Sequence, residues 1–193
     1  MKPDRVIAFE GADGVGKTTL IKAVHGELAR LGIPSNIFSS PGMELHSLGK
    51  LIYKLHHAPR SHDVFHISPT ALQALHVAAH IDFLESPRHH SRTILLDRCW
   101  WSAAVYGQAS GANKAALNLL VAAELQYWQT KKLVVVLMNR RPERANPPYS
   151  KIQRGYRILA RREHGKYPII RFTNQTDVVD GAYRLAARIK EVL

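Results

Sequence analysis

The chain has 193 residues with 46% apolar side chains, which predicts one globular domain over residues 1–193 and excludes a solenoid of repeats. Its apolar runs fall far short of the roughly 20 residues that a membrane-spanning helix needs, and its single cysteine excludes an internal disulfide, so we expect a cytoplasmic protein without a membrane partner. Its 27 lysines and arginines against 15 acidic residues give a net charge of +12, which indicates either polyanionic partners, nucleotides and nucleic acid among them, or a solvated basic surface.

Strand-like apolar runs alternate with helical patterns along the chain. The predicted strands are residues 6–9, 35–38, 93–96, 133–138 and 169–172. The predicted helices are residues 17–31, 45–56, 69–84, 114–130, 151–163 and 178–192. Loops are expected at 58–63, 86–91 and 139–148. This alternation predicts an α/β fold in which helices cover both faces of a parallel sheet.

A phosphate-binding loop follows the first predicted strand. The residues from Gly11 to Thr18 complete the pattern G-x-x-x-x-G-K-[ST], and a helical pattern comes next. Glycines let backbone N–H groups turn toward a polyphosphate, Lys17 supplies a positive charge, and the Thr18 hydroxyl can bind Mg²⁺. The alternative is a glycine-rich turn that matches by chance. The residues expected to bind the polyphosphate are Gly11, Ala12, Asp13, Gly14, Val15, Gly16, Lys17, Thr18 and Thr19.

Asp97 and Arg98 directly follow the third predicted strand. Ligands of open parallel sheets collect at the carboxyl ends of the strands, so both side chains should lie beside the phosphate-binding loop. Asp97 could bind Mg²⁺ through water or position a phosphate acceptor, and Arg98 offers a planar fork to a phosphate. A purely structural acid–base pair is the alternative.

Nine of the 11 histidines lie between His46 and His90, a density that raises the hypothesis of a metal site. The pairs His62/His66 and His76/His80 have the i, i+4 spacing of helical metal ligands, but no cysteine or H-E-x-x-H motif accompanies them. We therefore favour His76 and His80 as residues of an acceptor pocket over zinc ligands. Two further candidates are Trp100 and Trp101, which could either stack on a base or pack in the core.

The two motifs together resemble the thymidylate kinase family, a branch of the nucleoside monophosphate kinases. The resemblance rests on Phe9-Glu10-Gly11-Ala12-Asp13-Gly14-Val15-Gly16-Lys17-Thr18-Thr19 and on Asp97-Arg98-Cys99-Trp100-Trp101-Ser102-Ala103-Ala104-Val105-Tyr106-Gly107, with weaker likeness at Pro41-Gly42, Ala78-Ala79-His80, Arg141-Pro142-Glu143 and Arg154-Gly155-Tyr156. It implies a P-loop kinase fold with a five-stranded parallel sheet, commonly a homodimer. It also implies transfer of the γ-phosphoryl group of ATP, with Mg²⁺, to a deoxynucleoside monophosphate.

Residue roles carry over from this resemblance one position at a time. Lys17 and the loop amides would hold the ATP phosphates, and Thr18 with Asp97 would hold Mg²⁺. Asp13 matches a carboxylate near the 3′-hydroxyl of the acceptor sugar. Arg98 matches an arginine on the acceptor phosphate, and Tyr106 matches a tyrosine beside C2′ that disfavours a ribose hydroxyl. The implied substrate-binding residues are Asp13, Glu10, His76, His80, Arg98, Ser102 and Tyr106.

Several positions depart from the family pattern. The family has an arginine before the Pro-Gly of its second strand, where this chain has Ser39 and Ser40, so Lys50, Lys54 or Tyr53 would have to substitute for it in part. His80 corresponds to the arginine that contacts the base, and His76 corresponds roughly to the aromatic residue that stacks on it. These changes leave the identity of the base open.

The arginine-bearing lid of the family is shortened to residues 139–148, and Gly14 replaces a catalytic arginine found in one branch. The cation that stabilises the transition state must then come from elsewhere. The candidates are Arg140, Arg141, Arg144 and Arg154, of which we favour Arg140 and Arg144 as catalytic beside Lys17, Asp97 and Arg98. A basic surface loop is the alternative interpretation.

Two other functions remain open at this point. A kinase that acts on a nucleotide within DNA or RNA would account for the short lid, the missing acceptor arginine and the charge of +12. A nucleotide-binding module without turnover would account for the missing cations. Phosphoryl transfer to deoxynucleoside monophosphates above the level of a Lys17→Ala control would exclude the module.

Overall fold

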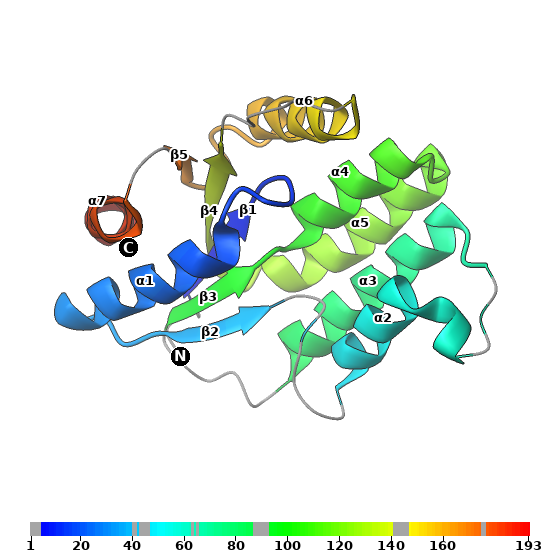
Figure 1. The fold of residues 1–193 in the computed structure, drawn as a ribbon, viewed down its shortest axis with the longest axis horizontal. Helices are drawn as coiled ribbons and strands as arrows, with labels where there is room; N and C mark the ends of the chain where they lie inside the picture. The colour runs from blue at the N-terminus through cyan, green and yellow to red at the C-terminus, as the bar shows by residue number, and fades with distance from the viewer. Residues whose placement is uncertain are drawn as a thin grey trace.

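Five parallel strands form one sheet at the centre of the protein (Figure 1). The computed structural model describes residues 5–39, 42, 47–62, 64, 66–86, 93–140, 147–174 and 177–193. The strand order is β2-β3-β1-β4-β5, and the register places Phe9 of β1 between Asp97 of β3 and Val136 of β4. The predicted α/β fold and all five predicted strands are confirmed. The strands are β1 (Arg5–Glu10), β2 (Asn36–Ser39), β3 (Thr93–Asp97), β4 (Lys132–Asn139) and β5 (Ile169–Thr173).

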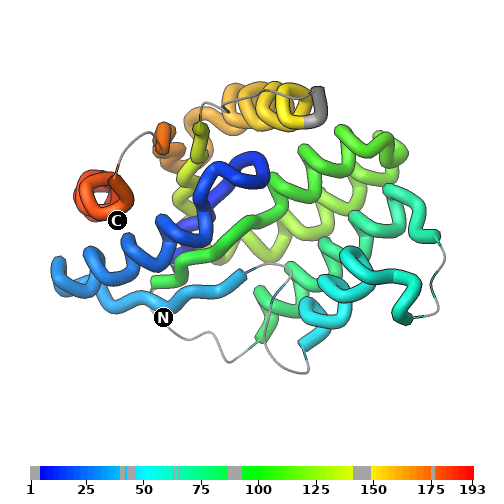
Figure 2. The backbone as a smooth tube through the Cα atoms, viewed as in Figure 1, coloured from blue at the N-terminus to red at the C-terminus, as the bar shows by residue number. Residues whose placement is uncertain are grey.

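Helices cover both faces of the sheet. α1 (Lys17–Arg30) packs against α7 (Val178–Val192) on one face, whereas α4 (Trp100–Ser110) and α5 (Lys114–Trp128) lie on the other (Figure 1). The remaining helices pack on this second group: α3 (Pro69–Glu85) on α5, α2 (Leu48–His57) on α3, and α6 (Pro147–Arg162) on α4. The backbone trace places α2 and α3 at the end of the long axis opposite α7 (Figure 2).

Three helical features differ from the sequence-based prediction. α4 was absent from the predicted helices because nearly every side of it is buried, so its sequence lacks the one-sided apolar period that identifies a surface helix. α6 begins at Pro147, inside the expected loop at 139–148, which is compatible with proline in the first turn. A short 3₁₀ helix (Pro59–His62) occupies most of the other expected loop, at 58–63.

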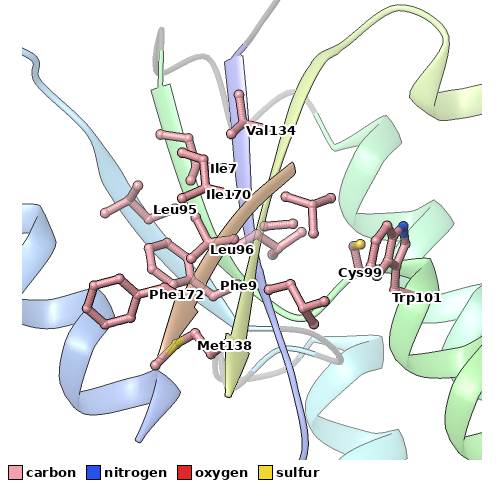
Figure 3. Close-up of a cluster of buried hydrophobic side chains, with 14 of the residues drawn as sticks. Ile7, Phe9, Leu95, Leu96, Cys99, Trp101, Val134, Met138, Ile170 and Phe172 are labelled. Atoms are coloured by element: carbon pink, nitrogen blue, oxygen red, sulfur yellow. The ribbon is translucent and has the colours of Figure 1, made fainter. Parts of the chain in front are cut away.

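The core lies between the sheet and its helices, where side chains from β1, β3, β4 and β5 meet (Figure 3). Trp100 and Trp101 are completely buried, so both belong to the core and neither is available to stack on a base. Cys99 is also fully buried, and burial raises the pKa of its thiol well above the usual value, which suits a small apolar residue rather than a nucleophile. Among the described residues, no helix combines the length and apolar character needed to span a bilayer.

Candidate active site

The phosphate-binding loop connects β1 to α1 at the carboxyl end of the sheet, and two of its glycines are required by close contacts. At Gly11, φ is +146° and a Cβ atom would lie 2.5 Å from the carbonyl oxygen of Met138. At Gly16, φ is +85° and a Cβ atom would lie 2.6 Å from the amide nitrogen of Asn174. The loop is thus folded tightly against the ends of β4 and β5, with the N-terminus of α1 directed at its centre.

Lys17 lies inside this loop. Its ammonium group donates hydrogen bonds of 2.9 Å to the carbonyl oxygens of Gly11 and Ala12, and the residue is 6% exposed. Burial, and after it the positive charge of Arg98, lower the pKa of Lys17 from 10.5 to about 8, against the opposing effect of nearby carboxylates. The side chain is therefore a cation held in a desolvated position, where a phosphate would be a strong partner.

Asn174 braces the loop from the end of β5, and sequence reasoning missed it. Its side-chain amide donates a hydrogen bond of 3.0 Å to the carbonyl oxygen of Val15, and its backbone N–H donates one of 2.7 Å to Asn139. The available signal was an asparagine two residues after a predicted strand, because the carboxyl ends of parallel strands meet at one edge of the sheet.

Asp97 and Thr18 meet where the sequence predicted a magnesium site. The Thr18 hydroxyl donates a hydrogen bond of 2.8 Å to Oδ2 of Asp97. The other carboxylate oxygen, Oδ1, is buried and has no hydrogen-bond partner among the described residues. A hydroxyl and a carboxylate oxygen with spare acceptor capacity are the ligand types that Mg²⁺ or its bound water takes, so the residues fit the ion. Within the described ranges, no group of three or more histidine, cysteine or acidic side chains is arranged to hold a metal.

Arg98 joins the loop to α4. Its guanidinium forms an ion pair with Asp13, donates a hydrogen bond of 2.9 Å to the hydroxyl of Ser102, and lies 5.1 Å from the ring centre of Tyr106. Among the described residues it is the only non-glycine with a positive φ, +77°. A bulky residue in this conformation is strained, and such strain concentrates at functional positions.

Glu10, the last residue of β1, holds the start of α4 in place through hydrogen bonds. It is fully buried and accepts hydrogen bonds from the backbone N–H of Cys99 (2.7 Å), the hydroxyl of Ser102 (2.7 Å) and the hydroxyl of Tyr156 (2.9 Å). A carboxylate with this many partners fixes the start of α4. Glu10 is not among the residues that line the neighbouring pocket, so any effect that it has on a bound ligand would pass through Ser102, which does line it.

A pocket of about 690 Å³ contains the loop and the predicted acceptor residues together. Its lining residues come from the phosphate-binding loop, from the carboxyl ends of β2 and β3, and from α2, α3 and α4. The predicted residues that line it are Asp13, Gly14, Gly16, Lys17, Thr18, Thr19, His76, His80, Asp97, Arg98, Ser102 and Tyr106; residues that sequence reasoning did not assign to the site are Ser39, Gly42, His56, His57, Gln73 and Ala103.

Tyr53 also lines the pocket, whereas Lys50 and Lys54 do not, so of the three candidates to replace the missing arginine only the tyrosine is in place. His76 and His56 meet edge to face with ring centres 5.2 Å apart. Burial, followed by the positive charges of His80 and His56, lowers the pKa of His76 to about 3. The His76 ring is therefore neutral near neutral pH.

His80 differs from His76 because a buried acid faces it. Nδ1 of His80 lies 2.9 Å from a carboxylate oxygen of Glu124 on α5, and the other oxygen of Glu124 accepts a hydrogen bond of 2.9 Å from the indole of Trp128. Burial alone would lower the pKa of His80, but Glu124 outweighs this effect and raises it. Sequence reasoning, which paired His80 only with His76, missed this completely buried partner on another helix.

Two of the four arginine candidates for transition-state stabilisation, Arg140 and Arg154, are described by the structure. Arg140 and Arg154 are exposed and do not line the pocket. Arg141 and Arg144 lie outside the described residues. The cations that the structure does bring to the pocket are Lys17 and Arg98.

A sequence model of the thymidylate kinase family matches residues 9–180. Among solved structures, the crystal structure of thymidylate kinase from Ehrlichia chaffeensis is similar, with a TM-score of 0.69 at 15% sequence identity and 98% of each chain covered. At this identity the likeness concerns the fold. A search of the curated proteins finds no match to this sequence.

Proposed function

Because this chain belongs to the thymidylate kinase family, we propose that it transfers the γ-phosphoryl group of ATP to dTMP or to a related or modified deoxypyrimidine monophosphate. The family and the fold make the protein a phosphotransferase of the nucleoside monophosphate kinase class. The finer proposal is supported most strongly by one observation: Lys17 of the phosphate-binding loop and Arg98 line the same pocket. One cation can bind the donor phosphates while the other binds the acceptor phosphate.

In this reaction an oxygen of the acceptor phosphate attacks the γ-phosphorus, the bond to the bridging oxygen breaks, and ADP leaves. The protein has little covalent work to do, so alignment and charge stabilisation account for the catalysis. Lys17 and the loop amides would bind the donor phosphates, and Arg98 would hold the acceptor phosphate in line. Arg140 and Arg144 stay candidates for the lid cation. They would have to approach the phosphates when both substrates are bound.

Thr18 and Asp97 would hold Mg²⁺, which when bound neutralises charge on the donor phosphates. The Asp97 oxygen without a protein partner supports this assignment, because a buried carboxylate oxygen is rarely left without one. Thr18 orients the same carboxylate through its hydroxyl.

The preference for a deoxy sugar would come from Tyr106. Its phenol donates a hydrogen bond to Asp13 and its ring lies beside Arg98, so the side chain is held from two sides. A ring fixed in this position leaves little room for a 2′-hydroxyl, which would have to displace it. Asp13 would then accept a hydrogen bond from the 3′-hydroxyl of the acceptor.

The test is a coupled assay of ADP release with purified protein, ATP and Mg²⁺ against dTMP, dUMP, dCMP, dAMP and dGMP. We expect turnover with at least one deoxypyrimidine nucleotide and loss of turnover in Lys17→Ala. Lys114→Ala, at an exposed lysine on α5, is the matched control and should keep full activity. Turnover equal to that of Lys17→Ala on every acceptor would favour a binding module without catalysis.

A second acceptor class is favoured by the surface of α6. This helix has five cations and no acidic residue, and Arg154, Arg157 and Arg161 are exposed without an acidic partner among the described residues. Such a surface suits a polyanion, so a nucleotide within DNA or RNA is the alternative acceptor. A steep fall in oligonucleotide affinity with salt, together with phosphorylation of the oligonucleotide, would favour this alternative.

We also propose, from the family resemblance, that the chain acts in the cytoplasm as one domain over residues 1–193 and forms a homodimer. Light scattering after size-exclusion chromatography tests the assembly, and the mass of a single chain would contradict the dimer.

A further inference from the structure

α3 supplies one wall of the pocket with three polar side chains. Gln73, His76 and His80 recur at helical spacing, so they share one face of the helix, and all three line the pocket. The proposed function assigns the acceptor phosphate to Arg98 and the acceptor sugar to the neighbourhood of Tyr106. The wall formed by α3 is then left for the base.

His80 is held from behind by a buried carboxylate. Nδ1 of its ring lies 2.9 Å from Oε2 of Glu124 on α5, and Oε1 of the same carboxylate accepts a hydrogen bond of 2.9 Å from the indole of Trp128. Glu124 is fully buried and is not among the residues that line the pocket. Because a carboxylate accepts hydrogen bonds and cannot donate them, Nδ1 carries a hydrogen atom in this pair.

The second ring nitrogen of His80, Nε2, is left for a ligand. It has no protein partner within the described part of the chain, yet it is not enclosed in the way that Oδ1 of Asp97 is. When the ring is charged, Nε2 carries a hydrogen atom and donates. When the ring is neutral and Nδ1 still donates to Glu124, Nε2 accepts instead. One atom can therefore recognise two kinds of base edge.

The two neighbours of His80 on this wall do not make the same distinction. The amide of Gln73 offers both a donor and an acceptor. Burial, followed by the charges of His80 and His56, lowers the pKa of His76 to about 3, so that ring has no charge to lose near neutral pH.

Groups from several elements act on the charge of His80. Against the opposing effect of burial, Glu124 and then Glu10 at the end of β1 raise its pKa. Burial lowers the pKa of His56 on α2. The other charged or titratable side chains that line the pocket beside α3 are Tyr53 and His57 of α2, Tyr106 of α4, and Arg98 just before α4.

On the basis of the proposed function, we propose that Glu124 is a positioning residue that selects the acceptor base through His80. While the ring is protonated, Nε2 donates to a base that presents an oxygen, such as O4 of uracil or thymine. Once the ring is neutral, Nε2 accepts from the exocyclic amine of cytosine. The preferred base therefore changes with pH in this chain.

Binding of dUMP and dCMP, measured by calorimetry without ATP, tests the proposal. The two nucleotides differ only in the hydrogen-bonding groups on one edge of the base, so the ratio of their affinities removes any titration that affects both, including those of the phosphate and of Lys17. From about pH 6 to about pH 8.5, we expect the preference for dUMP over dCMP to fall about tenfold.

A ratio that stays constant or rises with pH would overturn the proposal. If the chain still phosphorylates either nucleotide in that case, the proposed function stands and the selection by Glu124 alone is wrong. If neither nucleotide binds or reacts, both are wrong.

Glu124→Gln distinguishes base selection from a structural role. The indole of Trp128 donates and cannot accept, so it takes the amide oxygen, and the amide NH₂ then faces Nδ1 of His80. Nε2 keeps its hydrogen atom whether or not the ring is charged, so the preference for dUMP should stay constant over the same pH range. A variant that only weakens the fold would bind both nucleotides less tightly and keep the pH-dependent ratio.

Three further variants complete the test. Glu85→Gln makes the same change at an exposed acid on α3 and should keep the pH dependence of the unchanged chain. His57→Gln should also keep it, because the proposal assigns the titration to His80. His80→Gln, whose amide does not titrate, should give a constant ratio and replaces Glu124→Gln if that variant does not fold. A pH dependence that persists in His80→Gln, or one that is lost in His57→Gln, would overturn the proposal.

Discussion

Tyr106 donates a hydrogen bond of 3.0 Å to the carboxylate of Asp13, which connects the middle of α4 to the phosphate-binding loop. The same carboxylate pairs with Arg98, so one exposed acid orients two side chains of the acceptor pocket. Burial raises the pKa of Tyr106 to about 12, and Asp13 adds to this effect, so the phenol remains a donor throughout the physiological range. The phosphate-binding loop and α4 are thereby connected through the side chain of Asp13.

Tyr106→Phe removes this hydrogen bond but keeps the ring. We expect kcat/KM for the deoxynucleotide acceptor to fall about fivefold to tenfold, since one hydrogen bond to a charged group is lost. The preference for deoxynucleotides over ribonucleotides should persist, because the ring still occupies the space. Tyr106→Ala should reduce that preference as well. Equal preferences in the two variants would contradict the steric role of the ring.

Asp97→Asn tests the magnesium site. The amide keeps the size of the side chain and its oxygen can still accept from Thr18, but the negative charge is lost. The Mg²⁺ concentration that gives half-maximal activity should rise about tenfold or more, with ATP held constant. Asp82→Asn, on the exposed side of α3, is the control and should leave the Mg²⁺ dependence unchanged. An unchanged dependence in Asp97→Asn would remove this carboxylate from the site.

The pH dependence of ATP use should report Lys17. In the free protein its pKa is about 8, and only the protonated side chain attracts phosphate. We therefore expect kcat/KM for ATP to decrease as the pH rises through about 8, because this ratio reports the pKa values of the free enzyme. Lys17→Arg, whose guanidinium stays protonated, should lose that decrease even if its activity is low. A flat profile in the unchanged protein would contradict the assignment.

Glu124→Gln should change stability in a pH-dependent way. The pKa of His80 is raised in the folded protein, so the ion pair contributes its full stability below the unfolded pKa of about 6.5 and loses it as the pH rises through the folded value. The variant should be less stable by about 3 kcal/mol near pH 6, since it leaves a buried imidazolium unpaired. The difference should shrink as the pH rises through the folded pKa of His80, as measured by urea unfolding at a series of pH values. A constant difference would exclude an ion pair.

Asn174→Ala tests the brace behind the phosphate-binding loop. Loss of the hydrogen bond to Val15 should raise KM for ATP several-fold and lower the free energy of unfolding by about 1 kcal/mol. KM for the acceptor should change less, because the hydrogen bond of Asn174 is to Val15 in the phosphate-binding loop. Equal effects on both KM values would indicate a general loss of structure instead.

The conformation of the phosphate-binding loop was predictable from the sequence, because its glycines, Lys17 and Thr18 all lie within eight residues that directly follow a strand. Asp97 and Arg98 were also predictable, since parallel strands bring their carboxyl ends together. Glu124 and Asn174 were not predictable, because their roles depend on which helix or strand packs beside them. α4 was missed for a related reason: a helix buried on nearly all sides has no apolar period to recognise.

Arg98 keeps a backbone conformation, with φ of +77°, that glycine would adopt at a cost about 1 kcal/mol lower. Compared with Arg98→Ala, Arg98→Gly should therefore be the more stable protein, while both lack the guanidinium that would bind the acceptor phosphate. A screen for thermal stability among substitutions at this position would rank glycine above other residues without a guanidinium, and activity would not follow that ranking. Selection for stability alone and selection for anion binding thus choose different residues at position 98.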